Sequence, residues 1–82
     1  QKISNQMMKK YVPMVREALE EIKPYYENQK EFEVILENAE LYVKDAEKFL
    51  EDGQDEVAIL SIGYADGLVD ALRLAKGLEP KM

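Results

Sequence analysis

The sequence contains no cysteine and no histidine, and each absence removes a class of chemistry. Without cysteine the chain cannot form a disulfide, supply a thiolate nucleophile or bind zinc or an iron–sulfur cluster through sulfur. Without histidine it lacks the usual general base and the commonest ligand for transition metals. Carboxylates, lysines, tyrosines, two arginines and two serines remain, so any catalytic site would need a cluster that the fold creates. We therefore expect no enzymatic activity, no metal and no cofactor.

Long hydrophobic runs are also absent. No apolar stretch approaches the roughly 20 residues that a membrane-spanning helix needs, and the chain does not start with a signal-peptide pattern. We expect a cytoplasmic protein that does not bind membranes. Its 82 residues, 46% hydrophobic and 34% charged, suffice for a single globular domain over residues 1–82 with one modest core.

Positive charge is scarce in the middle of the chain. The net charge is -6, and residues 27–56 contain eleven acids against three lysines. Binding to nucleic acid requires a surface of lysine and arginine that displaces counterions from phosphates, whereas this segment would repel them. We therefore expect no nucleic-acid partner.

Apolar residues recur at steps of three and four in three segments, the spacing that gathers side chains on one face of an α-helix. Pro24 should end the first helix, and Gly53 and Gly77 should close the second and third. Pro13 is expected to kink the first helix or to mark its true beginning. The three apolar faces consist of Met8, Tyr11, Val12, Val15, Ala18, Leu19 and Ile22; of Phe32, Ile35, Leu36, Ala39, Tyr42, Val43, Ala46, Phe49 and Leu50; and of Ala58, Ser61, Ala65, Leu68, Val69 and Leu72.

The connection between the second and third helices is very short. Asp55 is a natural N-cap for a third helix that should run from about Glu56 to Lys76. So short a turn forces the two helices into an antiparallel hairpin. Together with the first helix, the sequence predicts an all-α fold, a three-helix bundle with up-down-up antiparallel topology.

The third helix is expected to be apolar almost all round, apart from a wedge that carries Asp66, Asp70 and Arg73. Gly63 and Gly67 each cost roughly 1 kcal/mol against alanine in a helix interior. Because the two glycines lie four residues apart, they leave a strip without side chains. The first or second helix, a second chain or a ligand could occupy this strip. The predicted face opposite the core consists of Ile59, Leu60, Gly63, Gly67 and Leu74.

A polar flank is predicted along the hairpin, because the short turn sets the two helices in register. Symmetric pairing about Gln54 puts Tyr42 near Asp66 and Asp45 near Gly63. Partly buried tyrosines need hydrogen-bond partners, so we interpret the flank as a structural network. The alternative is an enzyme-like site in which the three aspartates bind magnesium or calcium while the arginine or a tyrosine contacts a phosphate. The flank comprises Tyr42, Asp45, Tyr64, Asp66, Asp70 and Arg73.

We favour a binding function over catalysis. The enzyme-like site leaves the two glycines unexplained, and Arg73 should instead pair with Asp70, three residues before it. A protein-interaction or accessory module that docks through the third helix explains the glycines. Its partner would be another protein or a second copy of the chain in a homo-oligomer.

Two short motifs resemble a known family. Residues 42–50 read Tyr-Val-Lys-Asp-Ala-Glu-Lys-Phe-Leu, and residues 64–71 read Tyr-Ala-Asp-Gly-Leu-Val-Asp-Ala. This order resembles the short archaeal proteins grouped as domain-of-unknown-function family 357, with the pattern Tyr-x-x-Asp-Ala-x-x-Phe and then Tyr-Ala-x-Gly-x-x-Asp-Ala. The resemblance implies an archaeal source and a three-helix, spectrin-repeat-like bundle. It implies no activity and no catalytic residue, because the family has no established function.

Overall fold

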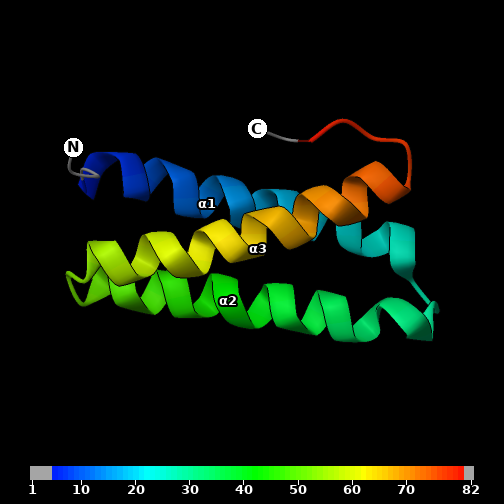
Figure 1. Ribbon diagram of the computed structural model, residues 1–82, viewed down its shortest axis with the longest axis horizontal. Helices are drawn as coiled ribbons and strands as arrows, with labels where there is room; N and C mark the ends of the chain where they lie inside the picture. Colours follow the sequence, from blue (N-terminus) through cyan, green and yellow to red (C-terminus); the bar gives the residue numbers. More distant parts are fainter. Residues whose placement is uncertain (1–4, 81–82) are drawn as a thin grey trace.

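Three α-helices run up, down and up along the long axis of the molecule (Figure 1). The computed structural model describes residues 5–80, and the remaining residues of the predicted domain, 1–4 and 81–82, lie outside the described residues. The described part contains no strand, so the predicted all-α three-helix bundle is confirmed. The helices are α1 (Asn5–Ile22), α2 (Glu33–Glu51) and α3 (Asp55–Ala75), and two short 3-10 helices, η1 (Lys23–Tyr26) and η2 (Lys30–Phe32), join α1 to α2.

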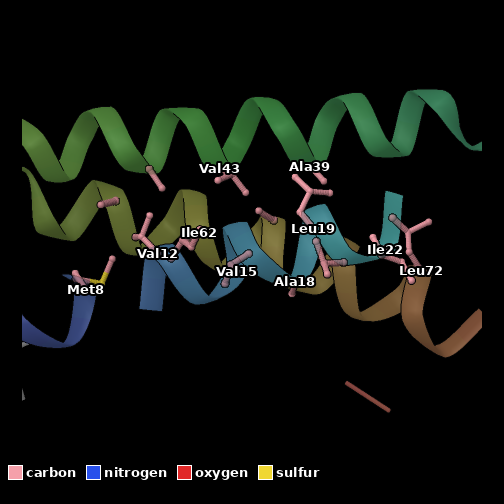
Figure 2. Close-up of a cluster of buried hydrophobic side chains, with 14 of the residues drawn as sticks. Met8, Val12, Val15, Ala18, Leu19, Ile22, Ala39, Val43, Ile62 and Leu72 are labelled. Carbon is pink, nitrogen blue, oxygen red and sulfur yellow. The ribbon is translucent and has the colours of Figure 1, made fainter. Parts of the chain in front are cut away.

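The predicted apolar stripe of α1 faces the other two helices (Figure 2). Pro13 does not mark the beginning of this helix, because α1 starts at Asn5 and continues through the proline to Ile22. A proline inside a helix leaves the carbonyl four residues earlier without its usual N–H donor. Both Pro13 and Lys9, which carries that carbonyl, are exposed, so water can hydrate the free oxygen.

The first helix ends just before Pro24, as predicted. Pro24 lies in the first turn of η1, directly after the end of α1, where its fixed φ is compatible with a helix start. Asn28 then reverses the chain with a φ of 66°. Asparagine tolerates this left-handed conformation better than most residues do.

Gly53 ends α2 as predicted, with a φ of 77°. The amide of Gln54 donates to the carbonyl of Phe49 at 2.8 Å, and the amide of Gly53 donates to the carbonyl of Leu50 at 3.1 Å. These bonds form a Schellman motif, which requires a left-handed residue at the position glycine occupies here. Gly77, with a φ of 75°, ends α3 in the same way.

The predicted role of Asp55 as N-cap is wrong. Gln54 occupies the N-cap position without a capping side-chain bond, and Asp55 is the first residue of α3. The Asp55 carboxylate instead accepts from the Asn5 side-chain amide at 3.3 Å, which ties the start of α3 to the start of α1. An acidic residue in the first turn still complements the helix dipole.

The core lies between the three helices and runs along the whole bundle (Figure 2). The predicted core face of α3 is correct at five positions, but it omitted Ile62, which is fully buried and among the largest buried side chains. Leu68, predicted as a core residue, is only partly buried. The face that α3 buries is therefore turned slightly from the predicted one.

Tyr26 closes the core at the end of the bundle where η1 meets α3. Its hydroxyl donates to the carbonyl of Leu72 at 2.6 Å, its ring contacts Phe32, and the ammonium of Lys76 lies over the ring at 4.6 Å. Burial raises the pKa of the Tyr26 phenol. Tyr26 was not predicted to be part of the core, because it lies beyond Pro24, where the first helix was expected to end.

Candidate protein interface

One side of α3 remains uncovered in the folded chain. It faces away from the core, and it contacts a neighbouring helix at its α2 edge, where the ring of Tyr64 lies against Tyr42. Leu60 is 75% exposed, Leu74 is 58% exposed and Tyr64 is 52% exposed. We call this surface the α3 outer face; it consists of Val57, Leu60, Gly63, Tyr64, Gly67, Ala71, Leu74 and Ala75.

None of these eight residues, which are all the exposed residues of α3 between positions 57 and 75, is charged. In α2, by contrast, six of the eight exposed residues are charged, and only Val34 and Leu41 are apolar. A helix that faces solvent normally carries charge on its outer side, as α2 does. The α3 outer face therefore lacks the composition of an ordinary solvated helix surface. The charged residues on α2 are Glu33, Glu37, Lys44, Glu47, Lys48 and Glu51.

Gly63 and Gly67 lie in the middle of the α3 outer face, and their surroundings are open. A Cβ built on either glycine would meet no atom of the described residues within 4 Å. The explanation that α1 or α2 occupies the strip inside the same chain is therefore wrong. Among residues 5–80 no neighbour lies close enough to these two positions to explain the cost of a glycine in a helix interior.

Four of the five residues predicted to lie opposite the core are exposed, and Ile59 is the exception. This side chain is partly buried and packs against the core, so it belongs to the edge of α3 next to its neighbours. The exposed surface also includes four residues that were not predicted to be part of it: Val57, Tyr64, Ala71 and Ala75. The change follows from the slightly different rotation of α3 about its axis.

The predicted polar flank is divided between the two edges of α3. On the edge next to α2, the ring of Tyr64 lies against the ring of Tyr42, with centroids 4.5 Å apart and planes inclined at 60°. Tilted aromatic pairs at this distance are worth about 0.5–1.5 kcal/mol beyond the area they bury. Tyr42 therefore contacts Tyr64, and the predicted proximity to Asp66 is not what the structure shows.

Asp66 and Asp70 lie on the other edge, next to α1. The hydroxyl of Tyr11 donates to the Asp66 carboxylate at 2.9 Å. Burial, and then this hydrogen bond, raise the pKa of the Tyr11 phenol to about 12. Burial and the nearby charge of Asp66 raise the pKa of the Asp70 carboxyl, although Arg73 opposes the shift. One carboxyl oxygen of Asp70 is buried and has no hydrogen-bond partner among residues 5–80.

Arg73 does not form the predicted ion pair with Asp70. Its Nε donates to the carbonyl of Glu79 at 2.7 Å, and its guanidinium lies 4.0 Å from the carboxylate of Glu21 on α1. The side chain thus holds the segment after α3 against the bundle. It contributes to the surface on the α1 edge and not to the α3 outer face.

The aspartates of the proposed metal site do not come together. Asp45 belongs to α2, whereas Asp66 lies on the edge of α3 that contacts α1. Within residues 5–80 no group of three or more acidic side chains is arranged to hold a metal ion.

An ion-pair network that was not predicted from the sequence joins α1 to α2. Arg16 binds Glu47 through two parallel bonds of 3.1 Å and binds Glu40 at 2.8 Å. Lys23 binds Glu40 at 2.9 Å and Glu20 at 3.0 Å. The bond to Glu47, with those to the other two glutamates, raises the pKa of Arg16 despite partial burial. The spacing in the sequence could have indicated this network. Arg16 and Lys23 lie seven residues apart on the first helix, and Glu40 and Glu47 lie seven residues apart on the second.

A shallow cleft of about 390 Å³ lies beside this network. Its floor contains Leu36 and Leu41, and its walls carry the balanced charges of two lysines and two glutamates. Two of these, Lys23 and Glu40, already pair with each other. The lining of the cleft therefore has no excess charge of one sign that would select a ligand. The charged wall residues are Lys23, Glu37, Glu40 and Lys44.

None of the helices between residues 5 and 80 combines the length and the hydrophobicity that crossing a bilayer requires.

In a comparison with known families, the model of the family described as "Protein of unknown function (DUF357)" matches residues 10–78. The chain belongs to this family, which confirms the resemblance in the two motifs and extends it into α1. No curated protein and no solved structure matches the chain.

Proposed function

We propose that this member of a family of unknown function is a protein-interaction or accessory module that binds its partner through the α3 outer face. It acts by binding rather than by catalysis. The observation that carries the proposal is the composition of the α3 outer face. Its eight exposed residues include no charged side chain, whereas α1 and α2 both expose several charged side chains. Contiguous apolar surface of this kind, rimmed by polar residues, is typical of protein-binding sites.

The two glycines support the same conclusion. Each costs about 1 kcal/mol relative to alanine in a helix, and neither relieves a clash within the described part of the chain. A partner that approaches the backbone closely would gain contact where a side chain would otherwise keep it away. The cost to the free chain is then offset in the complex.

The test uses a photo-crosslinker attached to one position at a time. The chain has no cysteine, so Leu60→Cys gives a single labelling site on the α3 outer face, and Glu37→Cys gives a matched exposed site on α2. Both variants are labelled with a benzophenone and irradiated in extract from cells that make the protein. The partner is identified by mass spectrometry, purified and titrated with the unlabelled wild-type chain.

The proposal expects an adduct with one defined protein from position 60 and none from position 37. Binding of that purified protein should weaken by about tenfold or more, which is about 1.4 kcal/mol, when Gly63→Leu and Gly67→Leu are combined. Equal adducts from both positions, or unchanged binding by the leucine variant, would contradict the proposal. Circular dichroism checks that the variant chain stays helical.

A further inference from the structure

We propose that the occupant of the α3 outer face is a second copy of this chain, with the two α3 helices antiparallel and crossing at Gly67. This inference rests on the proposed function, because it names the partner for the same surface.

Four residues of the α3 outer face form two symmetric pairs about Gly67, whereas Val57, Tyr64 and Ala75 have no counterpart within the face. Leu60 and Leu74 each lie seven residues from Gly67, and Gly63 and Ala71 each lie four residues from it. In an antiparallel pair centred on Gly67, each residue before the centre lies level with the residue equally far behind it on the other copy. A leucine then faces a leucine at both ends, and a small residue faces a small residue on either side of the crossing.

A two-fold contact requires this kind of self-complementary surface, because the same patch supplies both halves of the interface. A foreign partner places no such demand on the order of residues in α3. Small residues at the crossing let the two helix axes approach toward the short end of the usual distance of about 8–10 Å. The leucines, about 10 Å on either side at about 1.5 Å per residue, then cover the two ends of the contact.

The antiparallel direction is favoured by the ends of the helix. Asp55 and Glu56 occupy the first turn of α3, and Arg73 lies in its last turn. A parallel pair would bring the two acidic first turns level with each other and align the helix dipoles. An antiparallel pair keeps the two acidic first turns at opposite ends of the contact and sets the two helix dipoles in opposite directions.

The charge of the whole chain determines how this association depends on salt. Each copy carries a net charge of -6, so two copies repel each other at low ionic strength. The contact surface itself has no charge to be screened. Self-association through the α3 outer face should therefore strengthen as sodium chloride is added, whereas a contact held by ion pairs would weaken.

The register is tested with single-cysteine variants of the full chain. Leu60→Cys and Leu74→Cys are mixed, one of them carrying a tag that changes its mass, and are oxidised gently. A disulfide needs Cα atoms about 4.4–6.8 Å apart, so only cysteines that face each other are linked. The proposal expects the mixed Leu60–Leu74 product to be the major dimer, and a Glu37→Cys control to give none. Sedimentation of the wild type should approach twice the 9.5 kDa of one chain as protein and salt concentrations rise.

Other results would contradict either the antiparallel register or the second copy as partner. Major products that link position 60 to position 60 and position 74 to position 74 would overturn the antiparallel register. A wild-type chain that stays monomeric at high protein and salt concentrations, with no disulfide product, would overturn the second copy as partner. If the benzophenone at position 60 then captures a different protein that binds on titration, the proposed function still holds. If it captures nothing, both fail.

Discussion

Replacing Gly63 and Gly67 together by alanine should stabilise the folded chain by about 2 kcal/mol. Glycine in a helix interior costs about 0.8–1.0 kcal/mol relative to alanine, mainly because the unfolded glycine has more backbone freedom to lose. At both positions an added Cβ meets no described atom within 4 Å, so no clash opposes this gain. For a domain of this size, 1 kcal/mol shifts the melting temperature by about 4–8 °C, so the double variant should melt about 8–16 °C higher.

The assay is urea and thermal unfolding followed by circular dichroism, at protein concentrations low enough to keep the chain monomeric. Gly53→Ala and Gly77→Ala are the matched controls, because these glycines have φ values of 77° and 75°. A side chain there adopts a left-handed conformation that costs roughly 1–2 kcal/mol, so both controls should lower stability. A double variant at positions 63 and 67 that is less stable than the wild type would refute the reasoning, since it would mean that another part of the chain packs on those glycines.

Three further predictions follow from the core and the charged edges. Ile62→Ala should lower the free energy of unfolding by about 2–5 kcal/mol, because the side chain is fully buried; a loss below about 1 kcal/mol in urea unfolding would show that the core is misplaced. Asp70→Asn should raise stability at pH 7, because burial and the charge of Asp66 raise the pKa of this carboxyl and so oppose its ionised form. The gain over the wild type should shrink as the pH falls through that pKa and the wild-type group takes up its proton, and a loss at neutral pH would contradict the assignment. Arg16→Gln should cost about 1 kcal/mol at neutral pH. Hydrogen bonds from Lys23 and Arg16 lower the pKa of Glu20, and at Glu40, where burial acts to raise the pKa, the same two donors outweigh it. The stability that these pairs add is therefore present above the ordinary glutamate pKa and is lost as the pH falls below it, so a variant whose deficit persists unchanged in acid would argue against the network.

Local features of the sequence were sufficient to predict the three helices and the glycines that close the second and third. The steps of three and four in α1 and α2 defined a single buried face, and Gly53 and Gly77 took the left-handed positions that close α2 and α3. These features depend on residues near one another in the chain. They therefore do not depend on how distant segments of the chain pack.

The rotation of α3 could not be predicted as well, because its apolar residues surround most of the helix. A slight turn about the axis moves Ile62 into the core and Leu68 toward its edge without changing the quality of the pattern. The same turn, together with the position of α1, decides that Asp66 meets Tyr11 while Tyr42 meets Tyr64. Pairing within the hairpin alone considers two of the three helices and cannot find a partner on the third.

The most direct test of the α3 outer face as a docking surface is a set of amide spectra of isotope-labelled wild-type chain, recorded by nuclear magnetic resonance across a wide range of protein concentrations at high salt. We expect the amide signals of Gly63, Gly67 and their neighbours on the outer side of α3 to shift as the protein concentration rises. The amides of Val34 and Leu41, exposed apolar residues on α2, should stay in place. Shifts centred on α2, or spectra that do not change with concentration, would contradict the assignment of a second copy to the α3 outer face.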